Sequence, residues 1–180
     1  MRRAKLSIRL LAAGLAVGIA GPALAQSCVQ PAERVAFDVR ALQSQLMVTA
    51  LTCSRDADYN AFVRKFQGDL GGSFRTIQSH FRRTAGGGHQ RATDGFITQL
   101  ANDQSQDGLR QGSQFCANSV ALFQVAMAAP NVAALSEVSQ ERNVLNPMAA
   151  PVCAAPAPRT TPTRSPARPA STNRSAAVAR

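Results

Sequence analysis

The 180-residue sequence contains no tryptophan, one tyrosine and only two histidines. It has no C-x-x-C or C-x-x-C-H pair, which argues against a structural zinc site, a thioredoxin-like motif and c-type haem attachment. It also lacks the G-x-S-x-G motif of α/β-hydrolases and the G-x-x-x-x-G-K-[ST] motif that cradles phosphates. We therefore expect no cofactor and no metal, and no catalytic residue stands out by its motif.

Acidic residues are scarce, ten against twenty basic ones, so that the formal net charge is +10. The excess lies at the two ends: four basic residues precede residue 26, five arginines follow residue 147, and neither end contains an acid. Residues 26–146 carry eleven basic and ten acidic residues and are close to neutral. A folded domain that binds nucleic acid would concentrate Lys and Arg on its own surface, and we therefore expect no nucleic acid as a partner.

The sequence has one long apolar run, at residues 10–20, and it is shorter than the roughly 20 residues that a membrane-spanning helix needs. A cationic start precedes the run and Ala23-Leu24-Ala25 follows it, which is the pattern of a secretory signal peptide. We predict a signal peptide over residues 1–25, cleavage near Ala25, and a mature protein without a transmembrane segment in the periplasm or secreted. A competing interpretation makes Cys28 the lipidated residue of a lipoprotein, which the preceding Gln26-Ser27 fit poorly.

The segment from 26 to 146 favours an all-α fold. Between Pro31 and Cys53 the apolar residues recur every three or four positions, which predicts a central helix. Further helices are predicted over about 59–70, 74–85, 90–103 and 109–127, separated by glycines and ended by Pro130. A short amphipathic piece follows at 132–142, and no segment shows the alternation of a strand.

We therefore expect a small bundle of about five helices, stapled by disulfides. The residues that the spacing places toward its core include Val35, Val39, Leu42, Leu46, Ala50, Leu51, Phe62, Phe66, Leu70, Phe74, Ile77, Phe81, Ile97, Leu100, Leu109, Cys116, Val120, Phe123 and Met127. After this bundle, residues 147–180 are rich in Pro, Ala, Ser, Thr and Arg, which predicts a disordered tail.

Four cysteines in an exported protein predict two disulfides. Cys53 and Cys116 each lie in phase with the apolar stripe of their own predicted helix, and antiparallel packing of these helices brings Cys28 and Cys153 to the opposite end. This favours the nested pairing Cys53–Cys116 and Cys28–Cys153. Four cysteines allow three pairings, and the sequence alone leaves the other two open.

Two sets of side chains are candidates for function. Arg82 and Arg83, with Arg75 and Arg91 nearby in the sequence, form a candidate partner-binding patch, the alternative being a solvated helix face. His80 is a candidate base for a small secreted hydrolase if an Asp or Ser lies within hydrogen-bond reach in a pocket. A boundary side chain is the commoner role of such a histidine.

The stretch Leu42-Gln43-Ser44-Gln45-Leu46-Met47-Val48-Thr49-Ala50-Leu51-Thr52-Cys53, with Tyr59-Asn60-Ala61-Phe62 and Leu100-Ala101-Asn102, resembles small uncharacterised exported helical proteins of alphaproteobacteria. The likeness covers about residues 35–127. It implies a Gram-negative periplasmic setting and an inner cysteine pair, and it carries over no catalytic residue, because that group has no assigned activity.

The function that we expect is a non-enzymatic binding or structural module of the cell envelope. The partner would be an envelope protein, or an anionic envelope surface that the basic tail contacts. The alternatives are the hydrolase that uses His80 and a helical protein that binds an apolar ligand in a cavity lined by phenylalanines.

Overall fold

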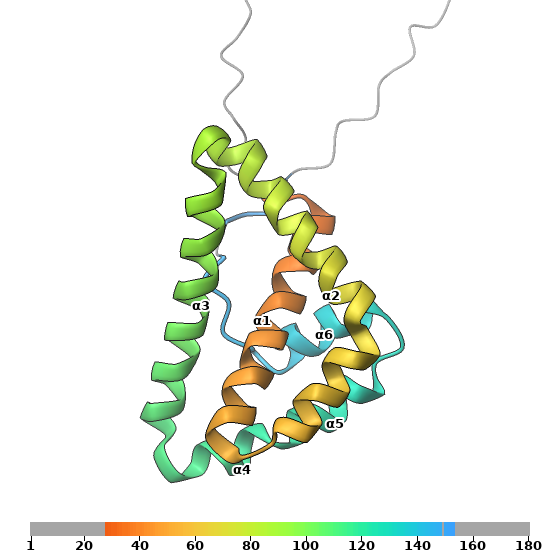
Figure 1. Cartoon of the computed structure of the whole chain (residues 1–180), viewed down its shortest axis with the longest axis vertical. Coiled ribbons are helices and arrows are strands. Elements are labelled where there is room, and N and C mark those ends of the chain that lie inside the picture. The colour runs from red at the N-terminus through yellow and green to blue at the C-terminus, as the bar shows by residue number, and fades with distance from the viewer. Residues whose placement is uncertain (1–27, 149, 154–180) are drawn as a thin grey trace, which may run out of the picture.

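The computed structural model describes residues 28–148 and 150–153, and most of them are helical (Figure 1). The order of elements is α1 (Pro31–Cys53), α2 (Asp56–Ala85), the 3₁₀ helix η1 (Gly86–Gly88), α3 (His89–Gln111), the 3₁₀ helix η2 (Gly112–Gln114), α4 (Phe115–Ser119), α5 (Ala121–Ala128) and α6 (Val132–Glu141). In the described part of the chain, β pairing is limited to one parallel bridge between Val29 and Val152. The prediction of an all-α bundle is confirmed, whereas the predicted signal peptide and residues 154–180 of the predicted tail lie outside the described residues.

The helix α1 occupies the centre of the bundle and has the bounds that the sequence predicts. Figure 1 shows it enclosed by α2, α3 and α6, and it contacts all three as well as α4. Its apolar residues are buried on more than one side, with Phe37, Val39, Leu42 and Leu46 completely shielded from solvent. A helix that is apolar around most of its circumference is stable only when other elements cover it, which explains its central place.

Two apolar clusters hold the other helices on α1. One joins the middle of α1 to the first half of α2, to α5 and to α6, with Phe62, Phe123 and Leu135 among its buried members. The other joins the start of α1 to the end of α2 and to α3, through Phe37 and Ile77 among others. Phe37 thereby lies where three helices meet.

The helix α2 is longer than the sequence predicts, because it continues through Gly71 and Gly72 and includes two predicted helices. Each glycine lowers helix stability by about 1 kcal/mol relative to Ala, yet the apolar residues on both sides pack on α1 and hold the helix through this point. The helix deviates elsewhere, at Phe66, where φ is −107° and ψ is 18°. It ends at Gly86, whose φ of 53° is left-handed, as the glycine run predicts.

The predicted helix over 109–127 is wrong in its first part. Leu109 belongs to the end of α3 and is 81% exposed, and the chain then turns at Gly112, where φ is 56°. The shorter helices α4 and α5 follow. At this turn the ring of Phe115 lies against Gly108, so closely that a Cβ atom at Gly108 would stand 3.2 Å from Phe115 Cε2. Leu51 and Phe74 are also exposed, contrary to the prediction.

Residues 142–148 and 150–153 form a strap that returns from α6 along α1 to the start of the bundle. On the way, Gln104 Nε2 of α3 donates to the carbonyl oxygens of both Ala41 and Leu145, each at 3.0 Å. The strap ends beside Val29, whose carbonyl oxygen accepts from Cys153 N at 2.8 Å. The packed structure therefore extends to Cys153, beyond the boundary at 146 that the sequence predicts.

A buried carboxylate fastens this strap and α6 to the central helix. Asp38 of α1 is 3% exposed and accepts hydrogen bonds from Ser136 Oγ at 3.1 Å and from Gln140 Nε2 at 2.8 Å. Its other oxygen accepts from Asn146 Nδ2 at 3.1 Å and faces Arg34 Nε at 3.4 Å. Ser136 and Gln140 belong to α6 and Asn146 belongs to the strap, so that Asp38 fixes both of these elements relative to α1.

Candidate functional site

All four cysteines are bonded, Cys28 to Cys153 and Cys53 to Cys116. This is the nested pairing that the sequence favours. The bond from Cys53 joins the last residue of α1 to α4, and the bond from Cys28 closes the strap onto the start of the bundle. The sulfur that lipid attachment to Cys28 would require is occupied by the disulfide.

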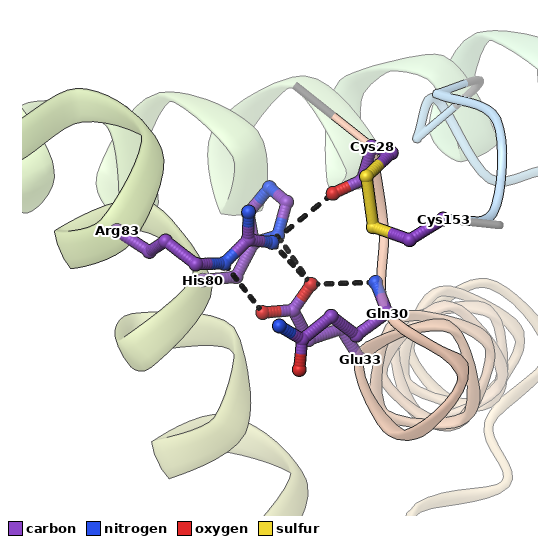
Figure 2. The surroundings of a disulfide bond; sticks show 6 residues. All are labelled: Cys28, Gln30, Glu33, His80, Arg83 and Cys153. Atoms are coloured by element: carbon purple, nitrogen blue, oxygen red, sulfur yellow. Dashed lines mark hydrogen bonds and ion pairs between the residues drawn. A yellow bond between two sulfur atoms is a disulfide. The ribbon is translucent and has the colours of Figure 1, made fainter. Parts of the chain in front are cut away.

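Beside the Cys28–Cys153 bond lies a group of interacting charged side chains, the Glu33 cluster, made of Glu33, His80 and Arg83 (Figure 2). Arg83 Nη2 donates to Glu33 Oε2 at 2.6 Å, and Arg83 Nε donates to Glu33 Oε1 at 3.3 Å. His80 Nδ1 lies 2.9 Å from Glu33 Oε2. An ionised carboxylate only accepts hydrogen bonds, so that Nδ1 carries the proton of this contact.

Local sequence explains how the cluster is assembled. Pro31 begins α1, and Glu33 lies in its first turn, where a negative charge faces the positive end of the helix dipole. From there its carboxylate reaches back to accept the backbone N–H of Gln30 at 2.8 Å, as in a capping box. Arg83 lies in the last turn of α2, where a cation is favoured, and also donates to the carbonyl oxygen of Cys28 at 3.1 Å.

Glu33 is 6% exposed, and its carboxylate remains easy to ionise. Burial by itself raises the pKa of this group, because the charged form loses water. The hydrogen bonds from His80, the Gln30 backbone and Arg83 favour the charged form and together leave the pKa of Glu33 below its usual value. The cluster therefore contains a carboxylate whose charge is fully compensated by its neighbours.

A histidine that is oriented by a carboxylate could act as a general base, but it also needs a pocket that brings a substrate to it. His80 is 4% exposed, and the rings of Phe37 and Phe81 pack edge-on against it with centroids at 5.0 and 5.1 Å. None of the surface hollows described here has His80 in its lining. The acidic partner that the hydrolase hypothesis needs is present, whereas the pocket for a substrate is not shown.

The four arginines of the predicted patch have different roles. Arg83 belongs to the Glu33 cluster and its guanidinium lies on a carboxylate. Arg75 and Arg82 are exposed on α2, two turns apart, and Arg91 is exposed near the start of α3. Arg91 lines a shallow hollow along α3 together with Asp94. The structure thus exposes all four arginines on two helices and engages one of them, Arg83, with a carboxylate.

The hypothesis of an apolar ligand requires a cavity lined by phenylalanines, and those side chains are instead packed in the core. Phe37, Phe62 and Phe115 are completely or almost completely buried. Among the hollows described here, a phenylalanine lines one, Phe123, at a site of about 240 Å³ beside Met127. This volume is below the range of about 300–1,000 Å³ that is typical of ligand pockets.

Within residues 28–148 and 150–153, no three His, Cys, Asp or Glu side chains are grouped so that they could hold a metal ion. None of the helices in the same residues has the length and hydrophobicity that crossing a membrane requires.

Sequence reasoning found His80 and Arg83 but missed Glu33, which is their common partner. The signal that was available is a glutamate three residues after the Gln30 that precedes Pro31, at the position where a capping box places an acid. Comparison of the chain with family models, with curated proteins and with solved structures finds no match.

Proposed function

We propose that the protein is exported to the periplasm and acts there as a non-enzymatic binding module of the cell envelope. The resemblance to small exported proteins of alphaproteobacteria supports this proposal, and the signal-peptide pattern supports the location. Two disulfides in one small bundle suit an oxidising compartment.

One observation carries the non-enzymatic part of the proposal: the described side chains best suited to catalysis are engaged in holding the bundle together. The four cysteines form disulfides. His80 and Glu33, the base and carboxylate of the hydrolase alternative, are buried against each other and bind Arg83 at the point where α1, α2 and the terminal disulfide meet. Such a cluster contributes to the stability of the fold, and a substrate has no described route to it.

The basic segment after Cys153 supports an anionic surface as the partner. It contains five arginines and no acidic residue, and it follows a described region that carries almost equal numbers of both charges. A polybasic segment is attracted to an anionic lipid surface by about 1 kcal/mol per Lys or Arg near that surface. Five arginines together give reversible binding that depends on salt.

Vesicle sedimentation tests this partner. The mature protein, residues 26–180, is compared with a variant in which Arg159, Arg164, Arg168, Arg174 and Arg180 are replaced by glutamine, so that the length of the chain is kept. We expect the wild type to sediment with vesicles that contain phosphatidylglycerol at low salt, to be released at high salt, and to ignore vesicles of phosphatidylcholine. Equal sedimentation of the variant, or none of the wild type, contradicts the proposal.

A pull-down from envelope extracts tests the other partner class, an envelope protein. The deletion used for comparison must begin at residue 154, because removal of residues 147–153 would also remove Cys153 and the strap. Capture of one partner by the full chain and its loss from the shortened chain would assign the interaction to residues 154–180. Fractionation of cells, with sequencing of the N-terminus, tests the location; we expect the mature chain to begin at Gln26.

A further inference from the structure

A hollow of about 430 Å³ lies where the middle of α1, the region from the end of α3 to the start of α5, and the start of the strap meet, and we call it the amide hollow. Gln45 contributes from the middle of α1, Asp107 and Gln111 from the last turn of α3, Asn118 from α4, and Arg142 from the start of the strap. Its volume lies in the range of about 300–1,000 Å³ that is typical of small-molecule sites. It is separate from the Glu33 cluster, none of whose residues lines it.

One wall of the hollow is held in place by its own hydrogen bonds. Gln111 Nε2 donates to Asp107 Oδ2 at 2.7 Å, and Asn118 Nδ2 donates to Gln111 Oε1 at 3.2 Å. Arg110 Nη2 forms an ion pair with Asp107 Oδ1 at 2.9 Å. Both oxygens of Asp107 are therefore engaged, and its negative charge is compensated before any ligand arrives.

Three other lining residues have side chains without partners in the described part of the chain. Among the described residues, the side chains of Gln45, Arg142 and Asn143 take part in no hydrogen bond or ion pair, although all three line the hollow. Gln45 is half-buried in the central helix, which limits the positions that its carboxamide can take. Arg142 also lines the hollow, and no described carboxylate forms an ion pair with its guanidinium.

Part of the lining is apolar. Leu122 is 9% exposed, and Val144 and Leu145 of the strap are half-buried. These side chains can contact the carbon skeleton of a ligand, whereas the polar side chains of the lining can contact its polar groups. Asn143 has a φ of 51°, a conformation that Asn adopts more readily than most residues, and it turns the chain so that the strap forms this side of the hollow.

We propose that the amide hollow binds a small carboxylate that also carries neutral hydroxyl or amide groups, an inference that rests on the proposed binding function. Arginine pairs with carboxylates through two parallel N–H donors, so that Arg142 selects an anion. Each carboxamide both donates and accepts, which suits hydroxyl and amide groups. Sugar acids and the C-terminal ends of short peptides both have this chemistry.

Titration calorimetry with matched pairs of probes tests the proposal and separates the two sources. Glucuronate is compared with glucose, and acetyl-Ala-Ala with its C-terminal amide, on the full-length protein with its disulfides intact. We expect the acid of one pair to bind about tenfold or more tightly than its neutral partner, because one hydrogen bond to a charged group is lost. The pair that shows this difference identifies the ligand class.

Variants place the binding in this hollow. Arg142→Gln should reduce the affinity for the acid to that for the neutral probe, and Gln45→Ala should weaken both acid and neutral probes. Arg64→Gln, which removes an exposed arginine of α2 that lies outside the hollow and outside the predicted arginine patch, is the matched control and should have no effect. Unfolding midpoints close to that of the wild type show that each variant is folded.

Three results would overturn this proposal: no binding of any probe, equal binding of acid and neutral probes, or an unchanged affinity in Arg142→Gln. The vesicle and pull-down experiments depend on residues 154–180 and not on Arg142. A failure of the probes together with success in those experiments would remove the amide hollow as a site and leave the proposed function standing.

Discussion

Replacement of Glu33 by glutamine should destabilise the protein at neutral pH and should destabilise it less in acid. Glutamine keeps the shape of the side chain but loses the charge, and its amide nitrogen cannot accept a hydrogen bond. In the wild type His80, Arg83 and the backbone of Gln30 all donate to this carboxylate. The change therefore tests what the charge of one carboxylate contributes.

The expected decrease in the free energy of unfolding follows from the hydrogen bonds that Glu33 accepts. A hydrogen bond to a charged group contributes about 1.5–3 kcal/mol. Three of the four donor contacts are to Oε2, and the amide oxygen of glutamine can take that position as a neutral acceptor. The contact of Arg83 Nε with Oε1 is lost, but the side chain of Arg83 is 31% exposed, so that water compensates part of this loss. We expect Glu33→Gln to lower the free energy of unfolding by about 2 kcal/mol at pH 7.

The pH dependence has a definite sign. The pKa of Glu33 in the folded protein lies below the usual value of 4.5, so that the folded state favours the charged form. The resulting stabilisation is fully present above about pH 4.5 and is lost as the pH falls through the lower pKa of the folded state. The difference between wild type and variant should therefore narrow in acid.

Urea unfolding with intact disulfides, followed by circular dichroism at several pH values, measures this difference. Glu137→Gln is the matched control, because Glu137 is exposed on α6. A difference at pH 7 below about 0.5 kcal/mol, the usual size of a surface substitution, would refute the reasoning. A difference that does not narrow between pH 7 and the lowest pH at which both proteins are folded would refute it as well.

Three further predictions concern the fold. Loss of the Cys28–Cys153 bond should lower stability by about 5 kcal/mol in the chain-entropy model, measured by urea unfolding of the double serine variant, and non-reducing peptide mapping should find this pair linked. Gly108→Ala should destabilise through contact with Phe115, whereas Gly95→Ala, which has open space for a Cβ atom, should stabilise its helix by about 0.5–1 kcal/mol; thermal midpoints that move the same way would contradict this. Asp38→Asn should cost about 2 kcal/mol or more and should increase hydrogen exchange in α6 and the strap, and unchanged exchange there would disprove its anchoring role.

The sequence predicts the central helix and the nested disulfides well, because both depend on local periodicity. The apolar residues between Pro31 and Cys53 follow one helical period, and the same three- and four-residue spacing includes Cys53 and Cys116. The same reasoning fails where glycine is the main signal. Gly71 and Gly72 remain helical because packing on α1 outweighs their low propensity, whereas Gly112 adopts a left-handed conformation and ends α3.

The Glu33 cluster could be predicted only in part, since its members are distant in the sequence. His80 and Glu33 are 47 positions apart, and nothing local shows that the end of α2 packs beside the start of α1. The amide hollow is less predictable still. In the sequence Gln45 is one polar residue of an amphipathic helix. Its place in the same hollow as Arg142 depends on the return of the strap, a tertiary feature without a local pattern.

The Cys28–Cys153 bond has a mechanical consequence. It joins the two ends of the described chain covalently, so that residues 28–153 form a closed ring with all the helices inside. A force applied between the segment before Cys28 and the segment after Cys153 would pass through a single sulfur–sulfur bond and bypass the helices. If one end is held at a surface and the other is pulled by a partner, the bundle carries no load until that bond is reduced.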